Sequence, residues 1–169
     1  CMASDIGDWW HLPVAFQKAI VWTMLFEVLG LGCGSGPLTG RYVPPVVAFT
    51  HFLRPGTIRL APWPDRVPLT AGHRRSVLDV GLYAALVALC LRALLSSDSL
   101  LRPEDLWPII GVLAVLGLRD KTVFLAARAE HYWSMLIVFV LADGDLAALF
   151  AGAMVVQLAI WWGAATSKL

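Results

Sequence analysis

The sequence predicts an all-α fold: a polytopic membrane helix bundle with about five transmembrane helices, built from residues 1–169 as a single transmembrane domain. Two observations carry this prediction. The chain is 59% hydrophobic and 15% charged, with a mean hydropathy of +0.72, well outside the usual range of soluble proteins. Several windows also approach the ~20 mostly apolar residues that a helix needs to cross about 30 Å of hydrocarbon.

Three of these windows each predict one helix, at Val14–Gly32, Val77–Leu95 and Leu146–Ala165. The remaining apolar stretch, Leu106–Ala142, is too long for one span and has a polar interruption near Arg119–Lys121. We therefore expect two helices there, Leu106–Leu118 and Thr122–Ala142, of which the first is short enough to be tilted, partly buried in protein or re-entrant.

The segment 33–76 is predicted to be a basic cytoplasmic loop. Its arginines are Arg41, Arg54, Arg59, Arg66, Arg74 and Arg75, against the single acid Asp65. Short loops rich in Arg and Lys stay on the cytoplasmic side. Within the loop, apolar residues alternate with Arg54 and Arg59, which predicts an amphipathic segment at the anionic membrane surface; they are Phe49, Phe52, Leu53, Leu60 and Trp63.

Several classes of function are disfavoured by the composition. A net charge of only +1 argues against nucleic-acid binding. The four histidines form no close pair and have no cysteine partner at zinc spacing, so the sequence predicts no metal site, and it names no cofactor. The chain opens at Cys1 without an initiator or a cleavable signal, so we expect it to be part of a longer protein.

The stretch "RDKTVFLAARAEHY" interrupts two apolar runs with ionisable groups. At 1.5 Å of rise per residue, Glu27, Arg128 and Glu130 lie about 8–12 Å from the helix ends predicted to be cytoplasmic, and Tyr83 and Gln157 lie at similar depth. Charges at such depth cost a few kcal/mol unless they are paired or hydrated. We therefore predict a shared polar layer in which Glu27 pairs with Arg128.

The candidate substrate-binding residues are Glu27, Arg119, Lys121, Arg128, Glu130 and His131. Arg119 and Lys121 are expected to form a basic rim for anionic head groups at the cytoplasmic helix junction. The alternative is that the layer is a purely structural ion-pair network. Lys18, Asp79 and Arg92 lie near helix ends, where we expect their side chains to snorkel to the interface.

A resemblance adds to this interpretation. The strings "DWWHLPVAFQKAIVWTMLFEVLGLG", "LRPGTIRLAPWPDRVPLTAGHRRSVLDVGLY" and "GLRDKTVFLAARAEHY" resemble an uncharacterised family of bacterial multi-pass membrane proteins, described only as a transmembrane domain of unknown function. The resemblance implies further helices before Cys1 and brings no activity. A fainter likeness lies in "IWWGAATSKL", which is similar to one helix ending in the vitamin K-dependent carboxylase-like transmembrane superfamily and would make Lys168 a candidate base or quinone-site residue.

Two functions follow. The first is a membrane-embedded enzyme or carrier for a lipid, a quinone or a similar amphiphile, with the polar layer handling protons or a head group. The second is a structural or assembly subunit of a larger membrane complex. We favour the first. The two differ in one feature: an enzyme or carrier needs a cavity at the layer, whereas a subunit has a filled one. The expected partners are membrane lipids and other membrane subunits, and the expected location is the bacterial inner or plasma membrane.

Overall fold

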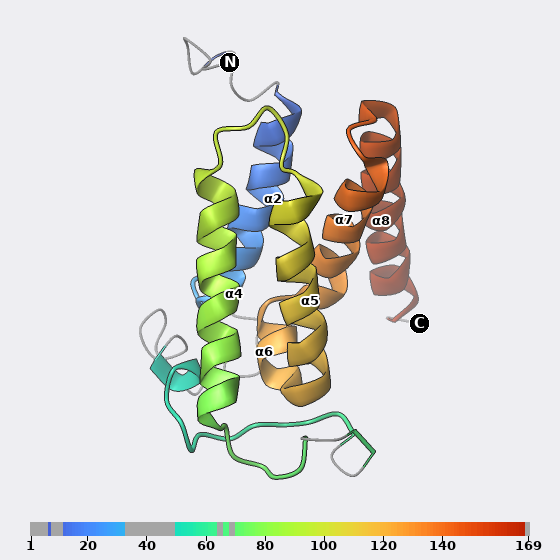
Figure 1. Cartoon of the computed structure of the whole chain (residues 1–169). Helices are drawn as coiled ribbons and strands as arrows, with labels where there is room; N and C mark the ends of the chain where they lie inside the picture. Colours follow the sequence, from blue (N-terminus) through green and yellow to red (C-terminus); the bar gives the residue numbers. More distant parts are fainter. Residues whose placement is uncertain (1–6, 8–11, 33–49, 64–65, 68–69, 168–169) are drawn as a thin grey trace.

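A computed structural model describes residue 7 and residues 12–32, 50–63, 66–67 and 70–167. The helices, in chain order, are α2 (Pro13–Val28), α4 (Val77–Leu95), α5 (Pro103–Arg119), α6 (Lys121–Ala126), α7 (Ala129–Ala142) and α8 (Leu146–Thr166). The longer helices alternate in direction and lie roughly side by side (Figure 1). No strand occurs in the part of the chain that the structure describes, which confirms the all-α prediction.

Local sequence signals explain where several helices begin. Ser76 and Asp79 form a capping box at the start of α4: the Asp79 carboxylate accepts the Ser76 N–H at 2.7 Å, and the Ser76 hydroxyl accepts the Asp79 N–H at 3.3 Å. Pro103 occupies the first turn of α5, where a missing N–H costs nothing. The Asp145 carboxylate accepts the backbone N–H groups of Ala147 and Ala148 in the first turn of α8.

The helix α4 is confirmed at both predicted ends, and α8 runs one residue past its predicted end. The first helix ends at Val28 rather than at Gly32, because the chain turns away at Gly30, whose φ is +77°. The short helix predicted at Leu106–Leu118 extends by about one turn at its start, since Pro103 is a compatible first residue.

The prediction of one helix over Thr122–Ala142 is wrong. The helix α6 ends at Ala126, α7 begins at Ala129, and Arg128 between them has the left-handed values φ 46° and ψ 43°. A residue in this conformation cannot continue a right-handed helix, so the chain changes direction there.

The helices α4 and α8 are long and apolar enough to cross a membrane, with mean hydropathies of 2.0 and 1.8. By contrast, α7 is apolar but has only 14 residues. The count of about five transmembrane helices therefore stays a prediction, while the described helices support the helical membrane character of the chain.

The core lies between α2, α4, α5 and α7 and is built from fully buried side chains such as Met24, Leu86, Leu113 and Leu136. In contrast, α8 packs along α7 (Figure 1) and buries only Leu149 and Ala153 among its residues. The two helices approach closely at Gly152, where a Cβ atom would lie 2.5 Å from Cγ1 of Val138.

Candidate functional site

Two short extended segments of the loop before α4 pair with one another through their backbones. The Arg59 N–H donates to the carbonyl of His73 at 2.9 Å, and the Arg75 N–H donates to the carbonyl of Thr57 at 2.8 Å. Side chains alternate between the two faces of an extended segment. Arg59 and Arg75 are therefore both buried, whereas Ile58 is exposed.

Arg75 reaches the junction between α5 and α6 and pairs there with Asp120. Its Nε and Nη2 donate to the same Asp120 oxygen at 3.1 and 2.5 Å, and both side chains are fully buried. Its guanidinium also donates to the Thr57 hydroxyl at 2.5 Å and lies 5.0 Å from the centre of the Phe52 ring. The second Asp120 oxygen accepts the N–H and the hydroxyl of Thr122. Both oxygens of this carboxylate are thus engaged.

Asp79, in the first turn of α4, is the second buried carboxylate. One oxygen accepts Arg119 Nε at 2.8 Å and Arg59 Nη1 at 3.4 Å, and the other accepts the N–H and the hydroxyl of Ser76. The Nη2 group of Arg59 donates to the carbonyls of residues 70–72 at 2.7–3.0 Å. Arg59 Nε is buried and has no hydrogen-bond partner among the described residues.

We call the residues Arg59, Arg75, Asp79, Arg119 and Asp120 the charge clamp. It ties the loop to the first turn of α4 and to the α5–α6 junction, which lie at the same end of the bundle (Figure 1). Removing one member of a buried pair strands the other as an uncompensated charge. The clamp therefore makes the position of the loop depend on both carboxylates.

A second polar contact joins α2 to the break between α6 and α7. Arg128 Nε lies 3.4 Å from Glu27 Oε1, which confirms the predicted pair. The two side chains are 34% and 18% exposed, so the pair is only partly buried. Gly32 lies so close to the Glu27 carboxylate that a Cβ atom at this position would displace it. The turn after α2 thus limits where Glu27 can lie.

The other predicted substrate-binding residues do not join this pair. Glu130 and His131 lie 3.8 Å apart with 44% and 34% of their side chains exposed, so they form a separate contact on the first turn of α7. Gln157, predicted to lie in the same layer, is exposed on α8. Tyr83 donates its hydroxyl to the carbonyl of Val28 at 3.0 Å. The predicted layer is therefore divided among several local contacts.

The junction predicted to carry the basic rim lies beside the loop, as expected, but one of its two rim residues is buried. The α5–α6 junction lies beside the arginine-rich loop, since the Lys121 N–H donates to the carbonyl of Leu60 at 2.8 Å. Lys121 is exposed, but Arg119 is only 8% exposed and pairs with Asp79. Arg119 therefore cannot present its charge to a head group.

Sequence reasoning missed the clamp because it assigned its members elsewhere. Asp79 was expected to snorkel, and Arg59 and Phe52 were expected to lie on the membrane surface, yet all three are at most 2% exposed. One local signal could have found Asp79: a Ser followed three residues later by an acid predicts a capping box and hence an ordered carboxylate. Phe49 and Lys168 lie outside the described residues.

His51 lies beside the clamp and carries an ionisable imidazole. Burial, together with the positive charge of Arg75, lowers the pKa of the His51 imidazole below its ordinary value of 6.5, and the Asp120 carboxylate opposes this in part. The carbonyl of His51 also accepts from the Arg75 guanidinium and the Thr57 hydroxyl. His51 is thus a neutral neighbour of the clamp at pH 7.

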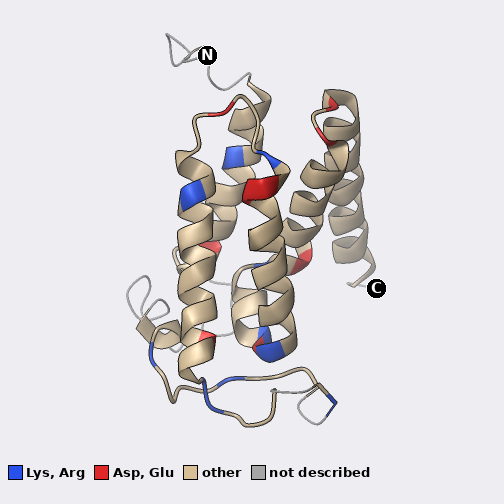
Figure 2. Ribbon diagram, in the orientation of Figure 1, with Lys and Arg blue, Asp and Glu red and all other residues tan. Residues whose placement is uncertain are grey.

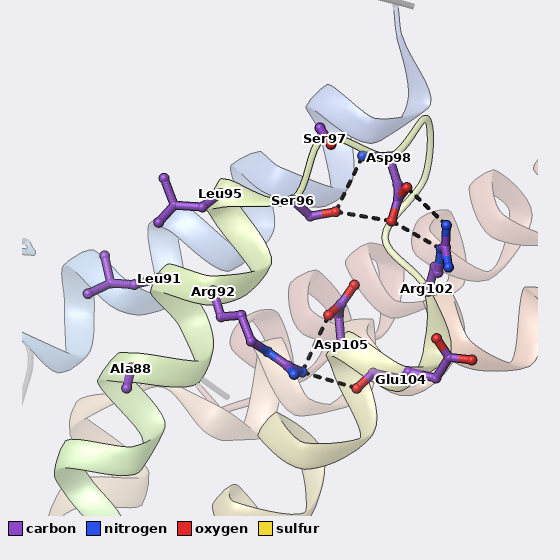
Figure 3. Close-up of a pocket in the computed structure, with 10 residues that line it drawn as sticks. All are labelled: Ala88, Leu91, Arg92, Leu95, Ser96, Ser97, Asp98, Arg102, Glu104 and Asp105. Carbon is purple, nitrogen blue, oxygen red and sulfur yellow. Dashed lines mark hydrogen bonds and ion pairs between the residues drawn. The ribbon is translucent and has the colours of Figure 1, made fainter.

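An open groove of about 750 Å³ lies at the other end of α4, between it and the start of α5 (Figure 3). Two ion pairs line it: Arg92 with Asp105 at 3.3 Å, and Arg102 with Asp98 at 3.0 Å. Both arginines are more than half exposed. The groove shares no residue with the clamp or with the predicted polar layer. No group of His, Cys, Asp and Glu that could hold a metal ion occurs among the described residues.

Comparison with known families agrees with a chain made of apolar helices. Residues 2–169 match the family described as "Transmembrane protein of unknown function (DUF3556)". The chain belongs to this family. Membership establishes a transmembrane protein and carries no activity, because the family description names none. No curated protein and no solved structure matches the chain.

Proposed function

We propose that this family member is a multi-pass subunit of a larger assembly in a bacterial inner or plasma membrane, and that its charged residues hold helices and loop in register. The observation that carries the proposal is the saturation of the buried carboxylates. Both oxygens of Asp79 and both oxygens of Asp120 accept hydrogen bonds from within the chain. Groups engaged in this way stabilise a structure and offer no open acceptor to a substrate or a proton.

The alternating helices support the multi-pass arrangement. Five of them, α2, α4, α5, α7 and α8, alternate in direction (Figure 1), and both α4 and α8 have the length and hydropathy of a membrane span. The shorter helices α2, α5 and α7 cross with the help of neighbouring protein or of a locally thinner bilayer. The basic loop lies at one end, which the positive-inside rule assigns to the cytoplasm.

A second function, an enzyme or carrier for a lipid or quinone, is favoured by one observation. The Glu27–Arg128 pair coincides with a helix break, and Arg128 is a non-glycine residue in a left-handed conformation. Such strain of about 1–3 kcal/mol is commonly stored at functional sites, and broken helices place polar groups at substrate sites in transporters. In this alternative Glu27, Arg128, Glu130 and His131 bind the polar end of the amphiphile.

A double substitution separates the two functions. Glu27→Leu and Arg128→Leu alone should each lower the free energy of unfolding in detergent by about 1–3 kcal/mol. This loss lies between those expected for exposed and for buried ion pairs, because the pair is partly buried. The Glu27→Leu/Arg128→Leu variant should recover much of that loss, because no charge is stranded.

The double variant is then tested in a strain that lacks the chromosomal gene, with the exposed pair variant Asp98→Leu/Arg102→Leu as its control. Under the subunit proposal, the stable double variant restores the growth of the strain. On a native gel it migrates in the same complex as the wild type, and this complex is larger than the chain alone. A stable double variant that enters the complex but fails to restore growth would instead establish the pair as a working site. Migration of the wild type at the mass of the chain alone would contradict the subunit proposal.

A further inference from the structure

The outer face of the loop that the clamp holds carries large apolar side chains in the open. Ile58, Leu60 and Trp63 are 68%, 46% and 53% exposed. Exposed apolar groups of this size on a loop at the end of a helix bundle are typical of a membrane interface, where aromatic and aliphatic side chains enter the head-group region. In a chain that belongs to a transmembrane family, this loop lies where the helices leave the bilayer.

The fold brings the backbone of a cationic residue next to the backbone of each of these apolar residues. Ile58 forms a β-bridge with Arg74, the carbonyl of Leu60 accepts the N–H of Lys121, and the carbonyl of Trp63 accepts the N–H of Arg66. Two of these three neighbours come from distant parts of the sequence, so the arrangement is a product of folding. It is an apolar surface interleaved with positive charges.

The charge of this face is not neutralised within the described part of the chain. Arg54, Arg66, Arg74 and Lys121 are exposed, and none of them pairs with a carboxylate among the described residues. The acids Asp79 and Asp120 at this end are buried in the clamp. Figure 2 shows the Lys and Arg positions along this loop. Among the described residues, this face is therefore positive.

We propose that this face, formed by Arg54, Ile58, Leu60, Trp63, Arg66, Arg74 and Lys121, docks the head groups of anionic phospholipids. The cations bind the phosphates through charge-assisted hydrogen bonds, and the three apolar side chains enter the boundary of the acyl chains. The buried neighbours Arg59 and Arg75 fix the backbone beneath, so the face is formed before the lipid binds. The proposal depends on the membrane location of the chain and not on its role as a subunit.

The test measures lipid binding by the full chain. The purified protein is incorporated into nanodiscs of phosphatidylcholine, either alone or with about 30 mol% phosphatidylglycerol. The unfolding temperature of the protein and the lipids that it retains after extraction are then compared between the two nanodiscs. We expect a higher unfolding temperature and enrichment of phosphatidylglycerol for the wild type. Each cation near an anionic surface is worth about 1 kcal/mol, which corresponds to about fivefold in affinity. Arg74→Gln/Lys121→Gln should therefore weaken phosphatidylglycerol binding on the order of 25-fold.

The matched control is Arg92→Gln/Arg102→Gln, which removes two exposed cations from the opposite end of the bundle and should leave lipid binding unchanged. A further variant, Ile58→Ser/Trp63→Ser, keeps every charge and should also weaken phosphatidylglycerol binding, which distinguishes a lipid from a free phosphate. Equal behaviour of the wild type in the two nanodiscs would overturn the proposal. So would an equal loss in the control, or binding that the serine variant leaves intact.

Discussion

Neighbouring residues in the loop have opposite roles. Arg74 is exposed at the face proposed to bind lipid, whereas Arg75 is buried and donates two hydrogen bonds to Asp120. The alternation of an extended segment explains which of the two points inward, but it does not identify the partner. Asp120 lies 45 residues further along the chain, so no local pattern in the sequence predicts this pair.

His51 supplies a prediction about pH. Its pKa is lowered in the folded protein by burial and by Arg75, so the unfolded chain takes up a proton at a higher pH than the folded protein does. The free energy of unfolding contributed by this group is therefore complete above about pH 6.5 and is lost as the pH falls through the lower, folded pKa.

This loss is the difference between the free energies of unfolding measured in one detergent at about pH 7.5 and about pH 5.5. The two pH values lie on either side of the ordinary histidine pKa. His51→Gln should reduce the difference between the two pH values, because it removes the titrating group next to the clamp. The exposed His73 provides the matched control, since His73→Gln should leave the difference unchanged. If the His51 variant keeps the full wild-type difference, another group causes it.

At the scale of elements, hydrophobic windows located the helices but not the break between α6 and α7. The residues "KTVFLAARAEHYW" contain no proline or glycine, so propensity alone predicts a continuous helix through Arg128. Tertiary contacts override that propensity: Asp120 anchors the start of α6 through Arg75, and Arg128 is held by Glu27. The predicted depths matched Glu27 with Arg128 although the helix ends behind them were wrong: Glu27 lies one residue before the end of α2, and Arg128 directly precedes α7.

The difference in stability between two variants at Arg128 distinguishes a helix break from a continuous helix by its sign. Compared in otherwise identical proteins that both lack the ion pair, Arg128→Gly should be more stable than Arg128→Ala by about 1 kcal/mol, since glycine adopts the left-handed conformation without cost. In a continuous helix alanine would instead be the more stable residue by about 1 kcal/mol. Urea denaturation of the two variants provides the measurement, and a more stable alanine variant would refute the break.

At the scale of the whole molecule, the sequence predicts the helical membrane class and most of the helix positions, because each rests on local composition and length. The basic loop was placed correctly beside the α5–α6 junction, since that depends only on alternation of the helices. The division of its arginines between a buried clamp and an open face was not predictable, because it depends on contacts such as Arg119 with Asp79, which are 40 residues apart. The clamp is what joins the loop and three helices into one unit.

The coupling energy between Arg75 and Asp120 measures how strongly the clamp joins the loop to the helices. Arg75→Met and Asp120→Leu should each lower the free energy of unfolding by about 3–5 kcal/mol, while the double variant should lose much less than the sum, because neither charge is stranded. The corresponding cycle on the exposed pair Asp98 and Arg102 should give a coupling below about 1 kcal/mol. Additive losses for Arg75 and Asp120, or a coupling no larger than that of the exposed pair, would show that the clamp does not join the loop to the helices.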